Sequence, residues 1–193
     1  MYKRILIIVA IICLGAVTVC TGQGPSKTKG DYKAFSLKDS RKVTEEKYDA
    51  LIKTGDIRVQ DPGDDGSLHF TAQIIGEDFY GGLYFYKDQL YNIELCQSAD
   101  FTEDQYDKEL KSFIYDKLIP FFRDRYGDVS NKYDYPDIGD VNENLSVLEE
   151  WIIGKKDVSV CVTKGENGYY ADILMEDLDL TQLKKVEDSK EDF

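Results

Sequence analysis

The stretch from Gly81 to Leu95 constrains the fold of this chain more than any other, because it predicts a β-hairpin that cannot stand alone. Two runs of aromatic and aliphatic residues alternate in side-chain direction and meet at Asp88-Gln89, which we take as a two-residue loop. With that loop, one face of the hairpin carries Tyr84, Tyr86, Tyr91, Ile93 and Leu95. An isolated hairpin is marginally stable in water, so this face requires cover from helices.

Two stretches carry the start signals of helices that would supply this cover. Thr44 is a good N-cap followed by acidic residues, and Gly55 stands where a C-terminal cap belongs. Thr102 begins a capping box, and the apolar stripe that follows runs to Tyr126-Gly127 in steps of three and four residues. We expect Pro120 to kink or restart this second helix, because proline lacks the amide hydrogen.

The other periodic segments alternate with period two and predict antiparallel strands. One strand is expected over 67–75, before the hairpin, and three more over about 148–153, 158–163 and 168–175. A turn at 165–168 between the last two strands gives the facing pairs Val162 with Ala171, Val160 with Ile173 and Val158 with Met175.

This order of elements predicts an α+β protein of two helix-plus-antiparallel-sheet repeats, whose strands can join in one continuous sheet. Both helix starts consist of an apolar residue, a threonine and acidic residues before a Tyr-Asp pair, which suggests a duplicated unit. We place the first repeat at 32–100 and the second at 101–186, with a short terminal helix from 177. Residues 187–193 are expected to fray.

The N-terminus has the composition of a secretory signal. Two basic residues precede the apolar run 5–19, which is shorter than the roughly 20 residues needed to span a bilayer. We predict a signal peptide over 1–22, a linker over 23–31, and a periplasmic or secreted protein. Lipoprotein processing at Cys20, which would give an outer-membrane lipoprotein, is the second choice because a bulky valine precedes the cysteine.

The chain is strongly acidic. It has 37 acidic and 24 basic residues, a formal net charge of −13, and loss of two basic residues with the signal leaves about −15. Such a charge repels phosphate backbones and anionic lipids, so we exclude nucleic acid as a partner and expect membrane contact only through the signal or a lipid anchor. Solubility explains most of this charge; the sharper hypothesis is an acidic face that steers towards a basic partner.

Sequence motifs for catalysis and metal binding are absent. His69 is the one histidine, and the chain has no nucleophile elbow, zinc motif, dithiol motif or phosphate-binding glycine loop. The loops 61–72 and 140–151 begin like calcium loops, but each lacks the glutamate that closes the cage at position twelve. We therefore assign no catalytic residue, no metal ligand and no cofactor.

Cys96 and Cys161 are the two cysteines beyond the signal. Strand alternation places both opposite the main apolar face, so a disulfide between them is open in an oxidising compartment. Two unpaired, half-buried thiols are the slightly favoured alternative.

Aromatic residues are the remaining unusual feature, with 14 tyrosines in 193 residues. Exposed tyrosine beside acidic residues is typical of binding rims for proteins or sugars, although most of these rings will have structural roles. The candidate binding residues are aromatic or apolar positions in loops, turns and hairpins: Tyr80, Leu83, Phe85, Tyr133, Tyr135, Trp151, Tyr169 and Tyr170.

Four stretches, 76–95, 106–127, 151–162 and 169–177, together resemble small secreted proteins of Gram-negative gut anaerobes, in which a helix and several strands precede a helix ending in Tyr-Gly. The chain departs from them at Asp128-Val129, where a proline is common. The resemblance implies tandem α+β modules related in shape to β-lactamase-inhibitor-like and outer-membrane-assembly lipoprotein (BamE/SmpA-like) folds. It implies no enzymatic activity and no site residues.

We therefore expect a non-catalytic protein-interaction or inhibitor-like module that acts in the cell envelope by binding. The alternative is a carbohydrate or small-ligand binder that uses Trp151 and neighbouring tyrosines. A hydrolase with paired carboxylates is less favoured, because the many acidic residues allow such a pair without indicating one. Burial of Leu83 and Phe85 would make the first hairpin the seam between repeats, whereas exposure would make it the binding surface.

Overall fold

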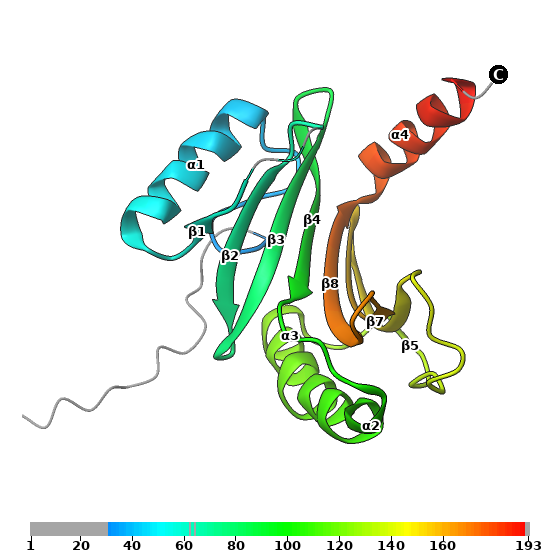
Figure 1. Cartoon of the computed structure of the whole chain (residues 1–193). Helices are drawn as coiled ribbons and strands as arrows, with labels where there is room; N and C mark the ends of the chain where they lie inside the picture. The colour runs from blue at the N-terminus through cyan, green and yellow to red at the C-terminus, as the bar shows by residue number, and fades with distance from the viewer. Residues whose placement is uncertain (1–30, 62, 64, 192–193) are drawn as a thin grey trace, which may run out of the picture.

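The computed structural model describes residues 31–191 except 62 and 64, so the predicted signal peptide and the linker up to residue 30 lie outside the described residues. The chain is an α+β protein with helices and one eight-stranded antiparallel sheet (Figure 1). None of the helices in the described part is long and apolar enough to cross a membrane.

The elements in order are α1 (Arg41–Thr54), β1 (Arg58–Val59), β2 (Leu68–Ile74), β3 (Glu77–Tyr86), β4 (Gln89–Gln97), α2 (Glu103–Gln105), π-helical turns at Tyr106–Leu110 and Phe113–Leu118, α3 (Ile119–Tyr126), β5 (Asn131–Lys132), β6 (Ser146–Ile153), β7 (Lys156–Lys164), β8 (Tyr169–Asp177) and α4 (Leu178–Glu191).

The strands lie in the order β1-β2-β3-β4-β8-β7-β6-β5, so β4 and β8 pair at the centre of the sheet. Leu95 of β4 faces Ile173 of β8, and both are fully buried. The predicted register of the last hairpin is confirmed for all three pairs, Val162 with Ala171, Val160 with Ile173 and Val158 with Met175.

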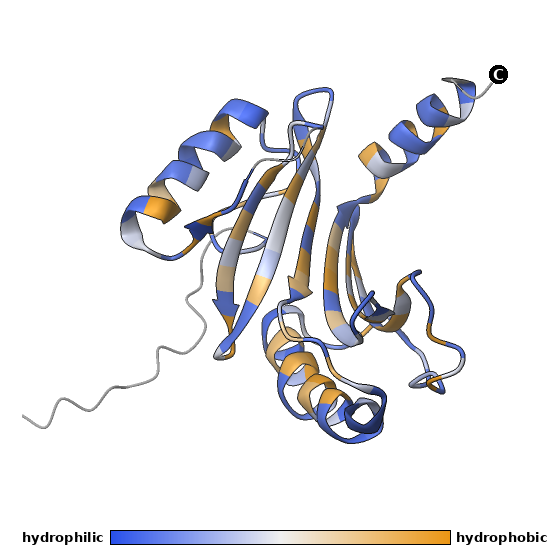
Figure 2. Ribbon diagram, viewed as in Figure 1, coloured by the Kyte–Doolittle hydropathy of each residue, from blue (hydrophilic) through white to orange (hydrophobic). Residues whose placement is uncertain are grey.

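Helices cover one face of this sheet. Tyr48 of α1 packs edge-on against Phe70 of β2, with ring centroids 6.4 Å apart. The helical segment 103–126 reaches both halves of the same face, because Phe113 lies 6.4 Å from Phe79 of β3 and other side chains contact β6 and β8. Hydrophobic bands alternate with hydrophilic ones along the strands, as period-two burial of one face requires (Figure 2).

The first hairpin forms, but its turn lies one residue earlier than predicted. Lys87 and Asp88 are the two loop residues, with φ of 48° and 61°, and Tyr86 pairs with Gln89. Positive φ at both central positions is the type I′ geometry, which matches the twist of two-residue hairpins. A register shift follows after Tyr84, so the sequence-based pairing is wrong along the whole hairpin.

This register shift turns the side chains of β3 to the opposite face, whereas Ile93 and Leu95 of β4 lie on the predicted core face. Leu83, Ile93 and Leu95 are fully buried, whereas the tyrosines predicted to form the core face, Tyr84, Tyr86 and Tyr91, are half-buried. Phe85 is half-buried beneath the Arg41 guanidinium, 4.1 Å from its ring centroid. The second strand of this hairpin, β4, pairs with β8 at the centre of the sheet.

The helix ends follow local side-chain chemistry. α1 begins at Arg41 with Ser40 as N-cap, one turn before the predicted Thr44, whose buried hydroxyl donates to the Ser40 carbonyl at 3.1 Å. The C-cap Gly55 is confirmed, with φ of 76°. The capping box at Thr102 is also confirmed, because the Gln105 side chain accepts the Thr102 amide at 3.0 Å.

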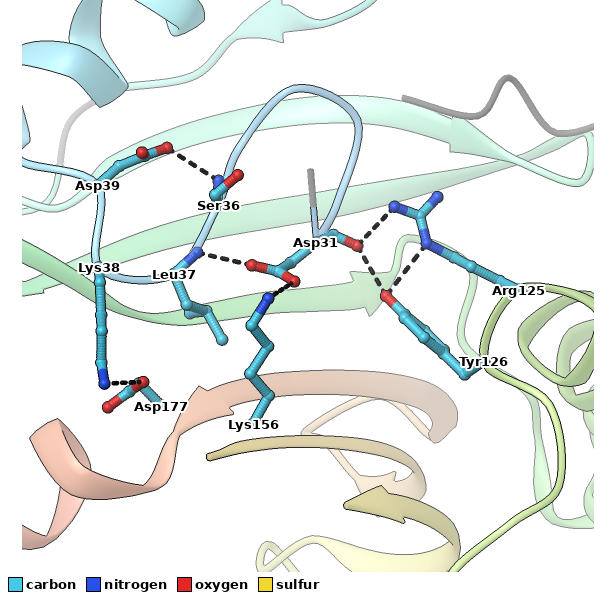
Figure 3. Close-up of polar contacts among 9 residues, drawn as sticks. All are labelled: Asp31, Ser36, Leu37, Lys38, Asp39, Arg125, Tyr126, Lys156 and Asp177. Carbon is cyan, nitrogen blue, oxygen red and sulfur yellow. Dashed lines mark hydrogen bonds and ion pairs between the residues drawn. The ribbon is translucent and has the colours of Figure 1, made fainter. Parts of the chain in front are cut away.

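Residues 31–39, which precede α1, tie the two halves of the molecule together (Figure 3). The Asp31 carboxylate accepts the Leu37 amide at 2.8 Å and pairs with Lys156 of β7, while its carbonyl accepts the Tyr126 hydroxyl of α3 at 2.7 Å. Lys38 pairs with Asp177 at the end of β8, at 3.1 Å. Asp31, the last residue of the predicted linker, is therefore part of the folded structure.

Candidate functional site

The candidate site is the face of the sheet opposite α1 and α3, which we call the open face. Strand register sets its side chains in rows across the centre of the sheet, because paired residues point to the same side. Three rows cross β4, β8, β7 and β6: Cys96, Asp172, Cys161 and Val147; Glu94, Leu174, Ser159 and Glu150; Asn92, Glu176, Asp157 and Ile152.

Five carboxylates therefore share this face: Glu94, Glu150, Asp157, Asp172 and Glu176. All positions of these four strands are described, and none that points to this side is a lysine or arginine. Like charges on adjacent strands repel one another unless cations balance them. The open face is thus a concentrated site of negative charge.

Asp172 is the most buried of the five, with 3% of its surface exposed. One carboxylate oxygen accepts the Thr163 hydroxyl at 2.7 Å, the other has no oxygen or nitrogen donor within the described residues, and the Cys96 thiol lies beside the carboxylate. Burial raises the pKa of Asp172 to about 6; the Thr163 bond opposes that rise, and the charge of Glu94 adds to it. An unpartnered carboxylate oxygen in this position is a site of unsatisfied hydrogen-bonding capacity.

The neighbouring carboxylates are perturbed for related reasons. Burial, followed by repulsion from Glu150, raises the pKa of Asp157 to about 6, although Ser159 donates to it at 3.0 Å. Burial also raises the pKa of Glu176, against the attraction of Lys185 on α4. The deprotonated form of this cluster is therefore disfavoured and would be stabilised by added positive charge.

A pocket of about 370 Å³ opens at the β2–β4 end of the open face. Its floor includes Gly82, which lies in register between His69 of β2 and Glu94 of β4 and, lacking a side chain, leaves room above it for the Tyr84 ring. Tyr80 and Tyr84 flank this floor along β3. The Tyr84 ring folds over Gly82, because a Cβ placed there would lie 2.7 Å from it.

The lone histidine beside this pocket contacts a serine, but among the described residues no hydrogen bond joins its imidazole to a carboxylate. The ring nitrogen Nε2 of His69 lies 2.9 Å from the Ser67 hydroxyl, and Asp65 accepts the Ser67 amide at 2.9 Å. The carboxylate thus contacts the serine instead of the imidazole, which reverses the order of a charge-relay triad. Across residues 31–191, apart from the two gaps, no group of three histidine, cysteine or acidic side chains could hold a metal ion.

A disulfide between Cys96 and Cys161 does not form. Both cysteines are free, and each pairs in register with Asp172 from opposite sides of β8. Two strand spacings separate their Cα atoms by about 10 Å, beyond the ~7 Å that a disulfide can bridge. Strand alternation correctly predicted that both cysteines lie on one face, but it could not predict that β8 lies between them.

The eight predicted binding residues do not gather in one place. Tyr80 and Tyr170 lie on the open face, the first 51% exposed and the second half-buried beside Asp172. Tyr133 is exposed next to β5. Phe85 and Tyr135 pack on the helix-covered side, where Tyr135 lies 4.9 Å from the Tyr106 ring.

The other three predicted residues are buried and present no surface to a partner. Leu83 is fully enclosed in the core. Trp151 donates its indole N–H to the Gly127 carbonyl at 3.0 Å, and Tyr169 packs 4.8 Å from Tyr106. Trp151 and Tyr169 stabilise the contact between the sheet and the 103–126 segment, which explains their presence without a binding role.

The sequence patterns did not predict the carboxylate rows, because the predicted binding residues were aromatic or apolar positions in loops, turns and hairpins. The usable signal was the polar alternation along the strands, at 92, 94 and 96, at 157, 159, 161 and 163, and at 170, 172 and 176. Each run alone is the ordinary polar side of a strand. Their concentration at one site follows from the pairing of β4 with β8, which no local pattern encodes.

The chain matches no family model, no curated protein and no solved structure. Its function is therefore argued from the geometry and charge of the open face.

Proposed function

We propose that this protein is an exported, non-catalytic binding module whose open face docks a basic protein partner. The observation that carries the proposal is the row arrangement of Glu94, Glu150, Asp157, Asp172 and Glu176 without lysine or arginine from the same four strands. A basic partner would relieve their mutual repulsion, and complementary charge gives an interface both specificity and a fast association rate.

The aromatic rings on the same face support a protein partner. Tyr80 and Tyr170 flank the acidic rows, and Ile152 and Leu174 add apolar surface among them. Tyrosine contributes contact area together with a hydroxyl that hydrogen-bonds, which is why it is enriched at interfaces. The carbohydrate alternative loses its main residue, because Trp151 is 1% exposed.

We also infer that the face arose from two copies of one unit. α1 and the 103–126 segment are each followed by four strands, and the sheet order mirrors about the β4–β8 pair. This inference agrees with the resemblance to secreted tandem α+β proteins related in shape to β-lactamase-inhibitor-like and BamE/SmpA-like folds. Related sequences in which the two halves share no common pattern would count against it.

Export and processing are testable on the intact chain. The intact mass of the protein recovered from the expressing cell's envelope and medium distinguishes cleavage after residue 22 from lipid attachment at Cys20. Recovery of only the uncleaved chain from the cytoplasm would contradict export.

The binding proposal is tested with a photo-crosslinking residue at Tyr170 and partner identification by mass spectrometry. The decisive variant is E150Q/D157N/E176Q, which removes three charges from the open face and keeps side-chain shape. Its matched control is E45Q/E46Q/D49N, which removes three charges from exposed positions on α1. We expect the purified partner to lose affinity for the first variant and to bind the control like the wild type.

Equal binding of both variants, or equal loss, would contradict the proposal. Two conditions add further checks. Affinity should fall with added salt, because exposed charges are screened. It should also fall as the pH drops through about 6, because Asp157 and Asp172 then take up protons and lose their charge.

A further inference from the structure

We propose that the pocket at Gly82 is the anchor site of this interface and binds the cationic end of one arginine or lysine side chain. The inference rests on the proposed function and names the chemistry of its central contact. The pocket volume of about 370 Å³ falls within the usual range of small-ligand sites, about 300–1,000 Å³. The pocket also opens on the same face as the carboxylate rows, at strand β4.

The geometry of the pocket fits an elongated cation. Gly82 separates His69 from Glu94, so their Cα atoms lie about 10 Å apart, and the Tyr84 ring occupies part of the space between them. Tyr80 and Tyr84 stand at the two ends of this gap along β3. A guanidinium or ammonium entering between the rings would meet their negative π faces and the Glu94 carboxylate together.

The Glu94 carboxylate is held in place for such a contact. The Tyr84 hydroxyl lies beside it, and burial together with the Glu94 charge raises the pKa of Tyr84. Glu94 has further acceptor capacity, because a carboxylate offers about four lone-pair sites. An arginine side chain could therefore bond to Glu94 without displacing Tyr84.

The charge around the pocket selects a cation over an anion. Asp61 and Glu94 line it, and none of the described lining residues is a lysine or arginine. His69 lies in the wall with its Nε2 atom bonded to Ser67.

The test is an NMR titration of the processed protein with three small probes. Nα-acetyl-arginine N-methylamide and the corresponding lysine compound carry the cation, and the citrulline compound has the shape of arginine without its charge. We expect saturable amide shifts centred on Gly82, Tyr84 and Glu94 with the cationic probes. The citrulline probe should bind at least about tenfold more weakly than the arginine probe, because it cannot form the charge-assisted bond to Glu94.

Two variants separate the pocket from charge elsewhere on the molecule. E94Q keeps the size of the side chain and an acceptor for Tyr84, and should weaken the arginine probe about tenfold. E166Q removes an exposed carboxylate from the turn before β8, outside the pocket and the carboxylate rows, and should leave probe binding within about twofold of wild type. An unchanged spectrum of distant core amides shows that each variant is folded.

The outcomes distinguish this inference from the proposed function. Probe shifts centred on Asp157 and Glu176, or equal effects of E94Q and E166Q on probe binding, would overturn the pocket as the cation site and leave the acidic docking face untouched. Equal binding of the citrulline and arginine probes would overturn cation recognition. The partner could also bind E150Q/D157N/E176Q like the wild type while the arginine probe still binds at Gly82. That result would overturn the wider docking face and leave the pocket supported as a cation site.

Discussion

At the scale of single residues, adjacent glycines on β3 let rings pack on both faces of the sheet. Gly81 faces the core, where a Cβ would lie 2.2 Å from the Phe70 ring, and Gly82 faces the pocket beneath Tyr84. Phe70 is fully buried and contacts the rings of Tyr32 and Phe35, so it has little room to move. Gly81 therefore allows the Phe70 ring to pack against the sheet in the core, and Gly82 allows the Tyr84 ring to lie against the sheet at the pocket.

We predict that G81A destabilises the protein by on the order of 1–3 kcal/mol, because overpacking displaces a buried ring. The matched control is G139A, in an exposed turn where a new Cβ meets nothing within 4 Å. Its free energy of unfolding should stay within about 0.5 kcal/mol of wild type. Urea denaturation measures both, and equal effects of the two substitutions would refute the packing argument.

Asp172 predicts a pH dependence of stability. Its pKa rises from 3.8 to about 6 on folding, so the native state holds the proton more tightly than the unfolded state. The stabilising contribution of this protonated group is full below pH ~4 and is lost as the pH rises towards about 6. We expect D172N to match wild type at pH 4 and to be more stable at pH 7.5, by on the order of 2 kcal/mol.

Urea denaturation at pH 4, 5, 6 and 7.5 tests this prediction through the difference between variant and wild type. The control E166Q changes an exposed carboxylate in the turn before β8 and should show no pH-dependent difference. A D172N effect that is constant across the range would mean that its cause is packing and not proton uptake.

At the scale of elements, the two hairpins show what local sequence can and cannot predict. The β7–β8 register was predictable, because Gly165 and Gly168 mark the turn and valines fill one face of β7. The β3–β4 register was not, because Lys87 and Asp88 adopt positive φ without the usual Asn-Gly signature. The turn shift alone would have kept Tyr84 on the face of Ile93; the register irregularity between Tyr84 and Phe85 exchanged core and surface for Leu83 and its neighbours on β3.

The same turn gives an element-scale prediction. K87N/D88G supplies the residue types that favour type I′ geometry and should raise the free energy of unfolding by about 0.5–1 kcal/mol. The ion pair of Lys87 with Glu187, and that of Asp88 with Arg41, involve largely exposed groups, so their loss should cost little. Thermal unfolding measures the change, and a lower midpoint than wild type would show that those pairs outweigh the turn geometry.

At the scale of the whole molecule, the chain brings its site together through one long-range pairing. β4 and β8 belong to different halves, and their contact aligns Glu94 with Leu174 and Cys96 with Asp172. Sequence patterns predicted the α+β class, the antiparallel strands and their apolar faces. They could not predict the acidic face, because it depends on the long-range pairing of β4 with β8, and no local sequence pattern specifies which strands pair.

The same whole-molecule view gives a role to the segment before α1. Asp31 is 8% exposed, and its contacts to Leu37, Lys156 and Tyr126 join that segment to β7 and α3. Removing the carboxylate leaves the buried Leu37 amide without an acceptor and Lys156 without its partner. Each loss lowers the free energy of unfolding, because a buried polar group is left without its partner. The loss is smaller for Lys156, whose side chain is partly exposed to water.

We therefore predict that D31A lowers the free energy of unfolding by on the order of 2 kcal/mol, with a single cooperative transition in urea. Hydrogen exchange should speed up in β7 and α3 as well as in 31–39, because the segment bridges the two halves. The matched control D49A removes an exposed carboxylate from α1 and should leave both measurements unchanged. Faster exchange confined to 31–39, with an unchanged urea midpoint, would show that the segment rests on the fold without stabilising it.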